Sequence, residues 1–313
     1  MTFDKLILIG LCWIGALTSL KAQTCCTGGI PLTGAINLNP STQGIRAGLT
    51  YDVNRLSDFV QGDRVLNNSF LKRETRSVIT QVDFFMRDSI GFSVLIPYSY
   101  LSEENTQTKT TYKASGLGDI SVWANKLLLN SQRSTLAVAV GVKLPTGETN
   151  IKDESGNFDL PLSLQPGTGS IDFMMASFLQ STFKFRPSLS YSATGVFKVN
   201  TVGKRYDAHP EYRYSNELDF YLGLSEQILL LNQLVTPQVQ LRLNRFGEHI
   251  QNGFENPNTG GSWLYLGTGF SWASTQKLSL SFRGQWPLLR TVNGFQLTTT
   301  DRFSLSAFYS FIK

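Results

Sequence analysis

Ten charged residues are spaced so that they share one face of a series of extended segments. The neighbouring positions in these segments are apolar, so charged and apolar side chains point to opposite sides. A charge that faces lipid at mid-depth costs roughly 2–4 kcal/mol for Arg or Lys, so in a membrane barrel these residues must face the lumen. We predict a lumen lined by Asp83, Arg87, Asp119, Lys143, Asp172, Glu217, Asp219, Arg242, Arg283 and Arg302.

Charged residues inside a barrel can have two roles. They can pair into a network that plugs and rigidifies a narrow barrel, or they can line a polar pore and bias what enters it. About eight strands give a filled interior and about sixteen to eighteen an open channel. A barrel of about twelve strands lies between these sizes, so both interpretations stay open.

The sequence gives little indication of a catalytic or metal-binding site. Hydrolysis needs a hydroxyl nucleophile within reach of an oriented His, but His209 and His249 fall in predicted external loops. There is no Gly-x-Ser-x-Gly motif and no cluster of metal ligands. The adjacent Cys25 and Cys26 could bind a soft metal or bridge to a partner. We predict neither an enzyme nor a bound metal or cofactor.

The elements that position the charges are predicted to be membrane-spanning β-strands. In the stretch 301–312, Phe303, Leu305 and Tyr309 fall on one face, and Arg302 and Ser304 fall on the other. This alternation is typical of a transmembrane barrel strand and recurs along the chain. We predict an all-β fold, a transmembrane antiparallel up-and-down β-barrel of about 12 strands. The predicted strands are 44–53, 75–87, 90–101, 116–129, 134–144, 169–185, 188–199, 215–229, 234–246, 262–273, 277–289 and 301–312.

The connections between these strands alternate in length. They are generally long after odd strands, as at 54–74 and 102–115, and only a few residues after even strands. Bacterial outer-membrane barrels have short periplasmic turns and longer external loops. The pattern therefore places both ends of a single barrel domain, residues 44–313, in the periplasm.

The N-terminus is predicted to direct export. Lys5 precedes an apolar run over 6–17, and a small-residue cleavage context follows at 20–22. The run is too short to span a membrane, so we predict a cleaved signal peptide at 1–22 and an irregular lead-in at 23–43, either periplasmic or plug-like. The pI of 9.0 reflects scattered charges of both signs and does not indicate a nucleic-acid partner.

Side-chain size and aromaticity give weaker indications about the lumen and the rims. Small inward residues leave space at Ala137, Ala139, Gly141, Gly267 and Gly269. Inward apolar residues, which suit a hydrophobic or aromatic solute, are Phe85, Met174, Phe178, Tyr221 and Phe308. Aromatic girdles at headgroup level are predicted from Tyr98, Tyr100, Trp123, Phe183, Phe185, Trp263, Tyr265, Trp272, Trp286, Tyr309 and Phe311.

Short motifs give the chain a resemblance to a known family. Residues 116–119 read Gly-Leu-Gly-Asp, and a strand ending in Pro-Thr-Gly at 145–147 follows. With the VLIPY stretch at 94–98, this resembles the "Putative MetA-pathway of phenol degradation" family of outer-membrane proteins, often called transporters. The N-terminal segment 24–31 is similar to that of Bacteroidetes members. The resemblance implies an outer-membrane barrel for passive uptake of hydrophobic or aromatic compounds.

These observations favour an outer-membrane channel for small solutes, including hydrophobic or aromatic ones. The expected partners are outer-membrane lipid, a small-molecule solute and the barrel-assembly machinery. One alternative is a surface protein whose long external loops bind a partner while the barrel anchors them. A second is a barrel enzyme that acts on envelope lipids.

Overall fold

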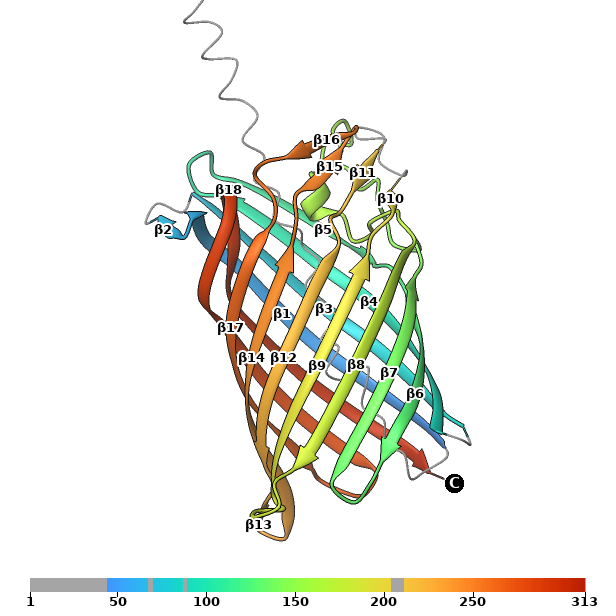
Figure 1. Cartoon of the computed structure of the whole chain (residues 1–313). Helices are drawn as coiled ribbons and strands as arrows, with labels where there is room; N and C mark the ends of the chain where they lie inside the picture. Colours follow the sequence, from blue (N-terminus) through green and yellow to red (C-terminus); the bar gives the residue numbers. More distant parts are fainter. Residues whose placement is uncertain (1–43, 67–69, 87–88, 204–210, 313) are drawn as a thin grey trace, which may run out of the picture.

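A closed antiparallel barrel dominates the computed structural model, which describes residues 44–66, 70–86, 89–203 and 211–312 (Figure 1). Eleven elements form the ring, and β12 closes it by pairing with both β9 and β14. The fold prediction is therefore confirmed. In ring order the elements are β12 (Glu217–Glu226), β9 (Leu189–Val199), β8 (Asp172–Thr182), β7 (Ser134–Lys143), β6 (Ser121–Asn130), β4 (Ile90–Asn105), β3 (Leu71–Phe85), β1 (Gly44–Gly62), β18 (Leu278–Ile312), β17 (Gly261–Ala273) and β14 (Gln233–Phe246).

The element β18 fills two strand positions. Its first part, to Val292, pairs antiparallel with β17, and its second part, from Phe295, pairs antiparallel with β1. Between the two parts, Gly294 adopts a φ of 60°, a left-handed conformation that glycine tolerates without strain. The predicted strands 277–289 and 301–312 are thus joined by a tight bend, which accounts for the predicted total of about twelve.

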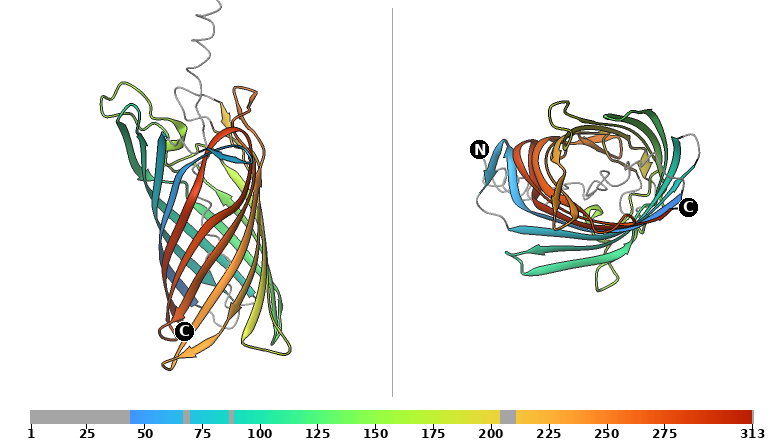
Figure 2. Two further views of the ribbon diagram at one scale, coloured as in Figure 1. Left: turned by 90° about the vertical axis from the view of Figure 1, so that its left-hand side faces the viewer. Right: turned by 90° about the horizontal axis from the view of Figure 1, so that it is seen from below.

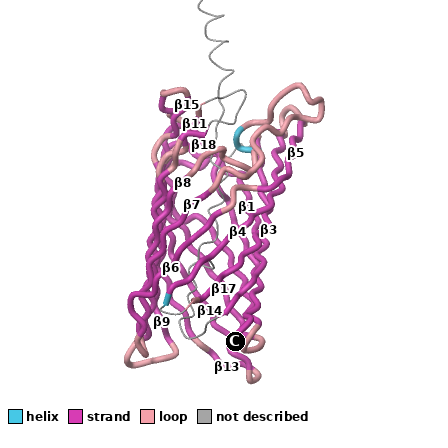
Figure 3. The backbone as a smooth tube through the Cα atoms, turned by 90° about the vertical axis from the view of Figure 1, so that its right-hand side faces the viewer, coloured by secondary structure: helices cyan, strands magenta, loops and turns pink. Residues whose placement is uncertain are grey.

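The two ends of the barrel differ as the loop lengths predicted. The short β6–β7 and β17–β18 turns, the hairpin strand β13 (Ile228–Leu230) and the C-terminus lie at one end (Figures 1 and 3). The opposite end carries the longer connections, with β2 (Arg64–Leu66), β5 (Thr110–Leu117) and the 3-10 helix η3 (Leu162–Leu164). There a separate four-stranded sheet forms from β10 (Val202–Gly203), β11 (Tyr212–Arg213), β15 (His249–Gln251) and β16 (Phe254–Asn256).

Several strands extend beyond their predicted ends. The predicted loop 54–74 is mostly occupied by the ends of β1 and β3, and the predicted loop 102–115 by the hairpin of β4 and β5. Charged side chains pair across these extensions, as Arg55 does with Glu74 at 3.0 Å. Charged residues of this kind suit the parts of strands that project into water. Because the strands were predicted from apolar alternation alone, their predicted ends fall too early.

The strand faces separate as a membrane barrel requires. Leu49, Phe92, Val140, Phe173 and Leu305 point outward and are exposed on the barrel surface. So large an apolar outer surface fits contact with lipid rather than with water. Among the described residues, no helix is long and apolar enough to cross a membrane.

Three aromatic residues predicted for the outer girdles lie inside instead. Trp123, Trp263 and Tyr265 are 1%, 3% and 7% exposed and fall on the luminal face of their strands. Trp123 fits because Gly141 lies opposite, where an added Cβ would be only 2.6 Å from the indole ring. These residues were assigned to the girdles because they are aromatic. Their position in the inward–outward alternation of the strand was not taken into account. Tyr98, Tyr100, Trp286, Tyr309 and Phe311 do point outward and are exposed.

The outward position of Val140, midway along β7, provides a test of membrane insertion. Val140→Arg is expected to destabilise the barrel by about 2–4 kcal/mol in lipid vesicles, because the charge would face hydrocarbon. The measurement is urea unfolding followed by tryptophan fluorescence, with Val140→Thr as the matched control of similar shape. Equal stability of the Arg and Thr variants would contradict the lipid-facing assignment.

Candidate luminal site

Two adjoining cavities occupy the barrel interior. The upper cavity is lined by Trp263, Tyr265, His249 and Gln285, among others, and is partly open to solvent. The central cavity is also partly open and reaches from Asp119 to Ile79. The two have Lys198, Glu217 and Arg302 in common, so they meet at a band of charged side chains.

That charged band is built on β9, β12 and β14. The Arg242 Nε donates to Asp219 at 2.7 Å, and Lys198 Nζ lies 2.8 Å from Glu217. Asn244 ties the two carboxylates together by donating to Glu217 at 2.8 Å and to Asp219 at 2.9 Å. Cross-strand neighbours on the luminal face thus form one network, which fixes both charge signs on one wall.

Two further pairs extend the charged surface along the neighbouring wall. Arg302 donates from Nε to both carboxylate oxygens of Asp52 at 3.0 Å, which links the second part of β18 to β1. Nearer the end with the short turns, Arg46 donates to Asp83 at 2.8 Å. The Arg46 guanidinium also lies 4.8 Å from the Phe308 ring centroid, a cation–π distance. In both pairs, opposite charges therefore neutralise each other.

A third network anchors the long external connection between β7 and β8. Lys143 Nζ lies 3.0 Å from Asp119 and 2.6 Å from Asp172. Asp119 also accepts hydrogen bonds from the Thr168 backbone N–H at 2.9 Å and from the Gly147 N–H at 3.0 Å. One carboxylate thereby joins β7 to both ends of the connection.

This network gives a physical reason for the short motifs in the sequence. Gly147 packs against Gly167 so closely that an added Cβ would lie 2.6 Å from the Gly167 Cα. Thr146 accepts a hydrogen bond from the Ile120 N–H at 2.9 Å. The Gly-Leu-Gly-Asp and Pro-Thr-Gly segments, distant in sequence, therefore form a single structural unit.

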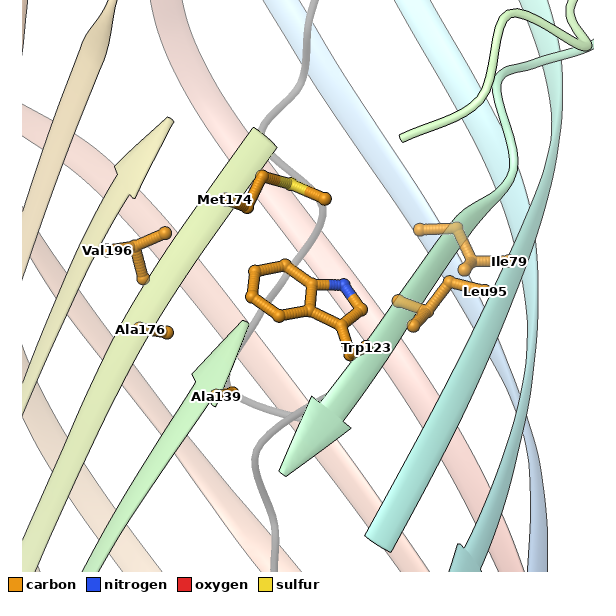
Figure 4. Packing of buried hydrophobic residues seen from close by; sticks show 7 residues of the cluster. All are labelled: Ile79, Leu95, Trp123, Ala139, Met174, Ala176 and Val196. Carbon is orange, nitrogen blue, oxygen red and sulfur yellow. The ribbon is translucent and has the colours of Figure 1, made fainter. Parts of the chain in front are cut away.

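An apolar cluster forms part of the wall of the central cavity (Figure 4). Trp123 lies at its centre, and its ring extends from β6 toward Met174 of β8 and Ile79 of β3. Ala139 and Ala176 are small enough to leave room for the indole on the adjacent strands. A solute crossing the barrel would meet an apolar surface here.

Arg283 differs from the other predicted luminal charges. Its Nε is buried and has no hydrogen-bond partner among the described residues, and the same is true of the Gln285 amide nitrogen. The opposing residues on β17 are Gly269 and Gly267, which offer no side chain to pair with them. An arginine without an ion pair among the described residues therefore lies on the luminal face of β18.

His249 covers the upper cavity from β15. Its Nδ1 accepts a hydrogen bond from the Ser215 N–H at 3.0 Å, and its ring stacks on Phe246 with centroids 5.5 Å apart. Burial, reinforced by Lys198 and opposed by Glu217, lowers the pKa of His249 to about 4. The imidazole is therefore neutral at pH 7, and its Nε2 carries the proton without a partner among the described residues.

The predicted luminal residues lie as follows. Eight of them form buried or nearly buried ion-pair networks in the barrel: Asp83, Asp119, Lys143, Asp172, Glu217, Asp219, Arg242 and Arg302. Arg283 is inside without an ion pair, and Arg87 lies outside the described residues. The prediction missed Arg46, Asp52 and Lys198, which alternate with apolar residues in the same way and could have been found by the same rule.

No group of three or more His, Cys, Asp or Glu side chains in the described ranges could hold a metal ion. His209, Cys25 and Cys26 fall outside those ranges, as do the predicted signal peptide and lead-in. His249, predicted to be in an external loop, lies in the short strand β15 of the outer sheet.

Fold and outer surface define the class of the protein as an outer-membrane β-barrel. The family described as "Putative MetA-pathway of phenol degradation" matches residues 56–305, and the chain belongs to this family, as the motifs indicated.

Comparison with solved structures gives similar folds at low sequence identity. The COG4313 outer membrane channel from Pseudomonas putida F1 is 14% identical with a TM-score of 0.70, and the match covers 86% of this chain and 96% of that chain. The β domain of the Bordetella autotransporter BrkA is 13% identical with a TM-score of 0.49, covering 87% of this chain and 100% of that chain. No curated protein matches the chain.

The anchoring network generates a prediction about stability. Lys143→Met would leave Asp119 and Asp172 facing each other without their shared cation, and is expected to cost about 3–5 kcal/mol. The measurement is urea unfolding in vesicles, with the exposed Lys113→Met as a control that should be near neutral. If both variants unfold at the same urea concentration, the network is not stabilising.

His249 generates a prediction about pH. Its folded-state pKa of about 4 lies below the ordinary 6.5, so only the unfolded form binds a proton between these values. The stability that His249 contributes should be complete above pH 6.5 and should fall by about 3 kcal/mol as the pH drops to about 4.

The measurement is the opening free energy of β11 and β15 from hydrogen–deuterium exchange, corrected for intrinsic rates, at pH 7 and pH 4.5. His249→Asn keeps an acceptor for the Ser215 N–H but does not titrate, so its opening free energy should be nearly independent of pH. The same loss in both proteins would assign the effect to other groups.

Proposed function

We propose that this protein is a passive outer-membrane channel for small solutes, including hydrophobic and aromatic ones. The observation that carries the proposal is the pair of adjoining cavities, which join at Lys198, Glu217 and Arg302. A barrel needed only as an anchor could fill this space with side chains. The family membership and the fold shared with a protein described as an outer membrane channel are consistent with this role.

The pairing of luminal charges suits a channel of this kind. Each wall carries positive and negative charges within a few ångströms of each other, as with Arg242 and Asp219. The net electrostatic potential in the lumen is therefore small. A neutral or aromatic solute then meets neither a strong electrostatic barrier nor a deep charged trap. The apolar Trp123 cluster below supplies a surface that such a solute can slide along.

The remaining expectations form part of the same proposal. Residues 1–22 act as a cleaved signal peptide, and 23–43 form a lead-in on the periplasmic side or in the lumen. The chain is inserted by the barrel-assembly machinery, contacts outer-membrane lipid through its apolar face, and has no enzymatic activity. The four-stranded outer sheet could also bind a partner at the cell surface, but the cavities favour transport as the main function.

Trp123 provides the test. Vesicles that contain the protein should swell faster in isosmotic arabinose than protein-free vesicles. Trp123→Ala should raise the rate several-fold, because it removes the bulkiest side chain of the apolar luminal cluster. Trp286→Ala removes an outward-facing indole instead and should leave the rate unchanged. If neither the parent protein nor Trp123→Ala accelerates swelling while both are folded, the channel proposal is wrong.

A further inference from the structure

The long connection between β7 and β8 folds over the central cavity. The last residue of β7 lies opposite the first residue of β8, so both strands stop at the same level. Residues 148–168, which we call the strap, continue beyond these external strand ends, and the helix η3 within them lies near β5 (Figure 3). Gln165, Pro166 and Thr168 of the strap line the central cavity together with residues of the barrel strands. The strap therefore bounds the external side of this cavity.

Apolar packing holds the strap against two separate parts of the external end. Leu160 and Leu164 are buried against Leu101, which lies on the luminal face of β4. Between them, Leu162 packs against Tyr212 of the four-stranded outer sheet. Side chains that pack on the luminal face of a strand occupy space inside the barrel, and close packing leaves no room there for a solute. The strap therefore takes up part of the entrance from outside.

Hydrogen bonds join the two legs of the strap into one unit. The Gln165 side chain accepts a hydrogen bond from the Ile151 N–H at 2.9 Å, and its amide donates to the carbonyl oxygens of Ile151 and Leu160, both at 3.0 Å. At the base of the strap, the Gly167 N–H donates to the Glu148 carbonyl oxygen at 2.8 Å. Together with the Asp119 network, these bonds fix the position of the strap.

The strap surface that faces the cavity has its polar side-chain atoms already in use. Both the carbonyl oxygen and the amide nitrogen of Gln165 bond to the strap backbone. The Thr168 hydroxyl donates to Asp119 at 2.6 Å, and the ring of Pro166 has no polar group. Pore diameter and lining hydrogen-bond groups are the features that select a neutral solute. Here the strap leaves diameter as its main means of selection.

We propose that the strap is the size-selective element at the external entrance of the channel. It covers the central cavity and limits the solutes that enter from outside by their size rather than by their hydrogen-bonding groups. This inference rests on the proposed channel function and names the segment that sets its selectivity.

The first test removes the part of the strap that covers the cavity. Because Gly167 is hydrogen-bonded to Glu148, the two ends lie side by side, and Gly-Gly can replace residues 150–165 while Asp119 and Thr168 stay in place. Swelling of vesicles is measured in isosmotic arabinose, sucrose and raffinose, which increase in size in this order. The replacement should raise the sucrose rate several-fold relative to the arabinose rate of the same protein.

A matched control shortens the exposed tip of the same connection. The Asp153 N–H donates to the Phe158 carbonyl oxygen at 2.9 Å, so a two-residue Asn-Gly turn can replace residues 154–157. These residues are exposed and are not part of the cavity lining. The shortened tip should keep the sucrose-to-arabinose ratio of the parent protein.

A second variant keeps the strap complete and makes its inner surface larger. Pro166→Trp adds a bulky side chain at the cavity lining and should slow arabinose swelling several-fold. Pro257→Trp places the same side chain at an exposed position between β16 and β17 and should leave the rate unchanged. Circular dichroism in the vesicles establishes that each variant is folded, so a loss of rate is not a loss of the barrel.

The outcomes separate this inference from the channel function. Arabinose swelling of the parent with an unchanged sucrose-to-arabinose ratio after the replacement, or with no effect of Pro166→Trp, would overturn the strap proposal and leave the channel intact. Swelling of the replacement variant alone would support the strap as the cover and overturn an open channel in the parent. Folded proteins that never swell would overturn both.

Discussion

The structure depends on one constraint, that backbone N–H and C=O groups in hydrocarbon must find their partners within the protein. The sheet meets it by closing, so that β12 pairs with β14 and the first strand pairs with the last from Gly44 opposite Ile312 onward. Once the ring is closed, each strand has one face toward lipid and one toward the lumen (Figure 2). A charged residue at mid-depth is then stable when it faces the interior, as Arg242 and Arg302 do.

That confinement explains how the interior is organised. Charges in a narrow lumen are stable when they are paired, and cross-strand neighbours supply the partners, as in Arg302 with Asp52 and Arg242 with Asp219. The same pairing leaves the cavities almost neutral, so an unpaired group has a large local effect. Arg283 is such a group because glycine occupies the opposing position on β17.

Much of the fold could be predicted because a period of two, broken by turns of unequal length, is a local property of the sequence. The inward position of Asp119 and Lys143 follows from it directly. The interior positions of Trp123 and Trp263 were missed because the girdle prediction rested on aromatic type, although the same alternation places both residues inside. His249 was also missed as a cavity residue, because it reaches the lumen through a small outer sheet whose pairing no local pattern specifies.

The most direct test of the account is the ionic current through the refolded barrel in a planar lipid bilayer. Adjoining cavities that meet at a charged band predict discrete single-channel openings of small and uniform amplitude, at voltages where protein-free bilayers stay silent. A protein that retains the circular dichroism of a β-barrel, inserts into the bilayer and never conducts would contradict the claim that the lumen is a path for solutes. The charged networks would then be a plug that rigidifies the barrel.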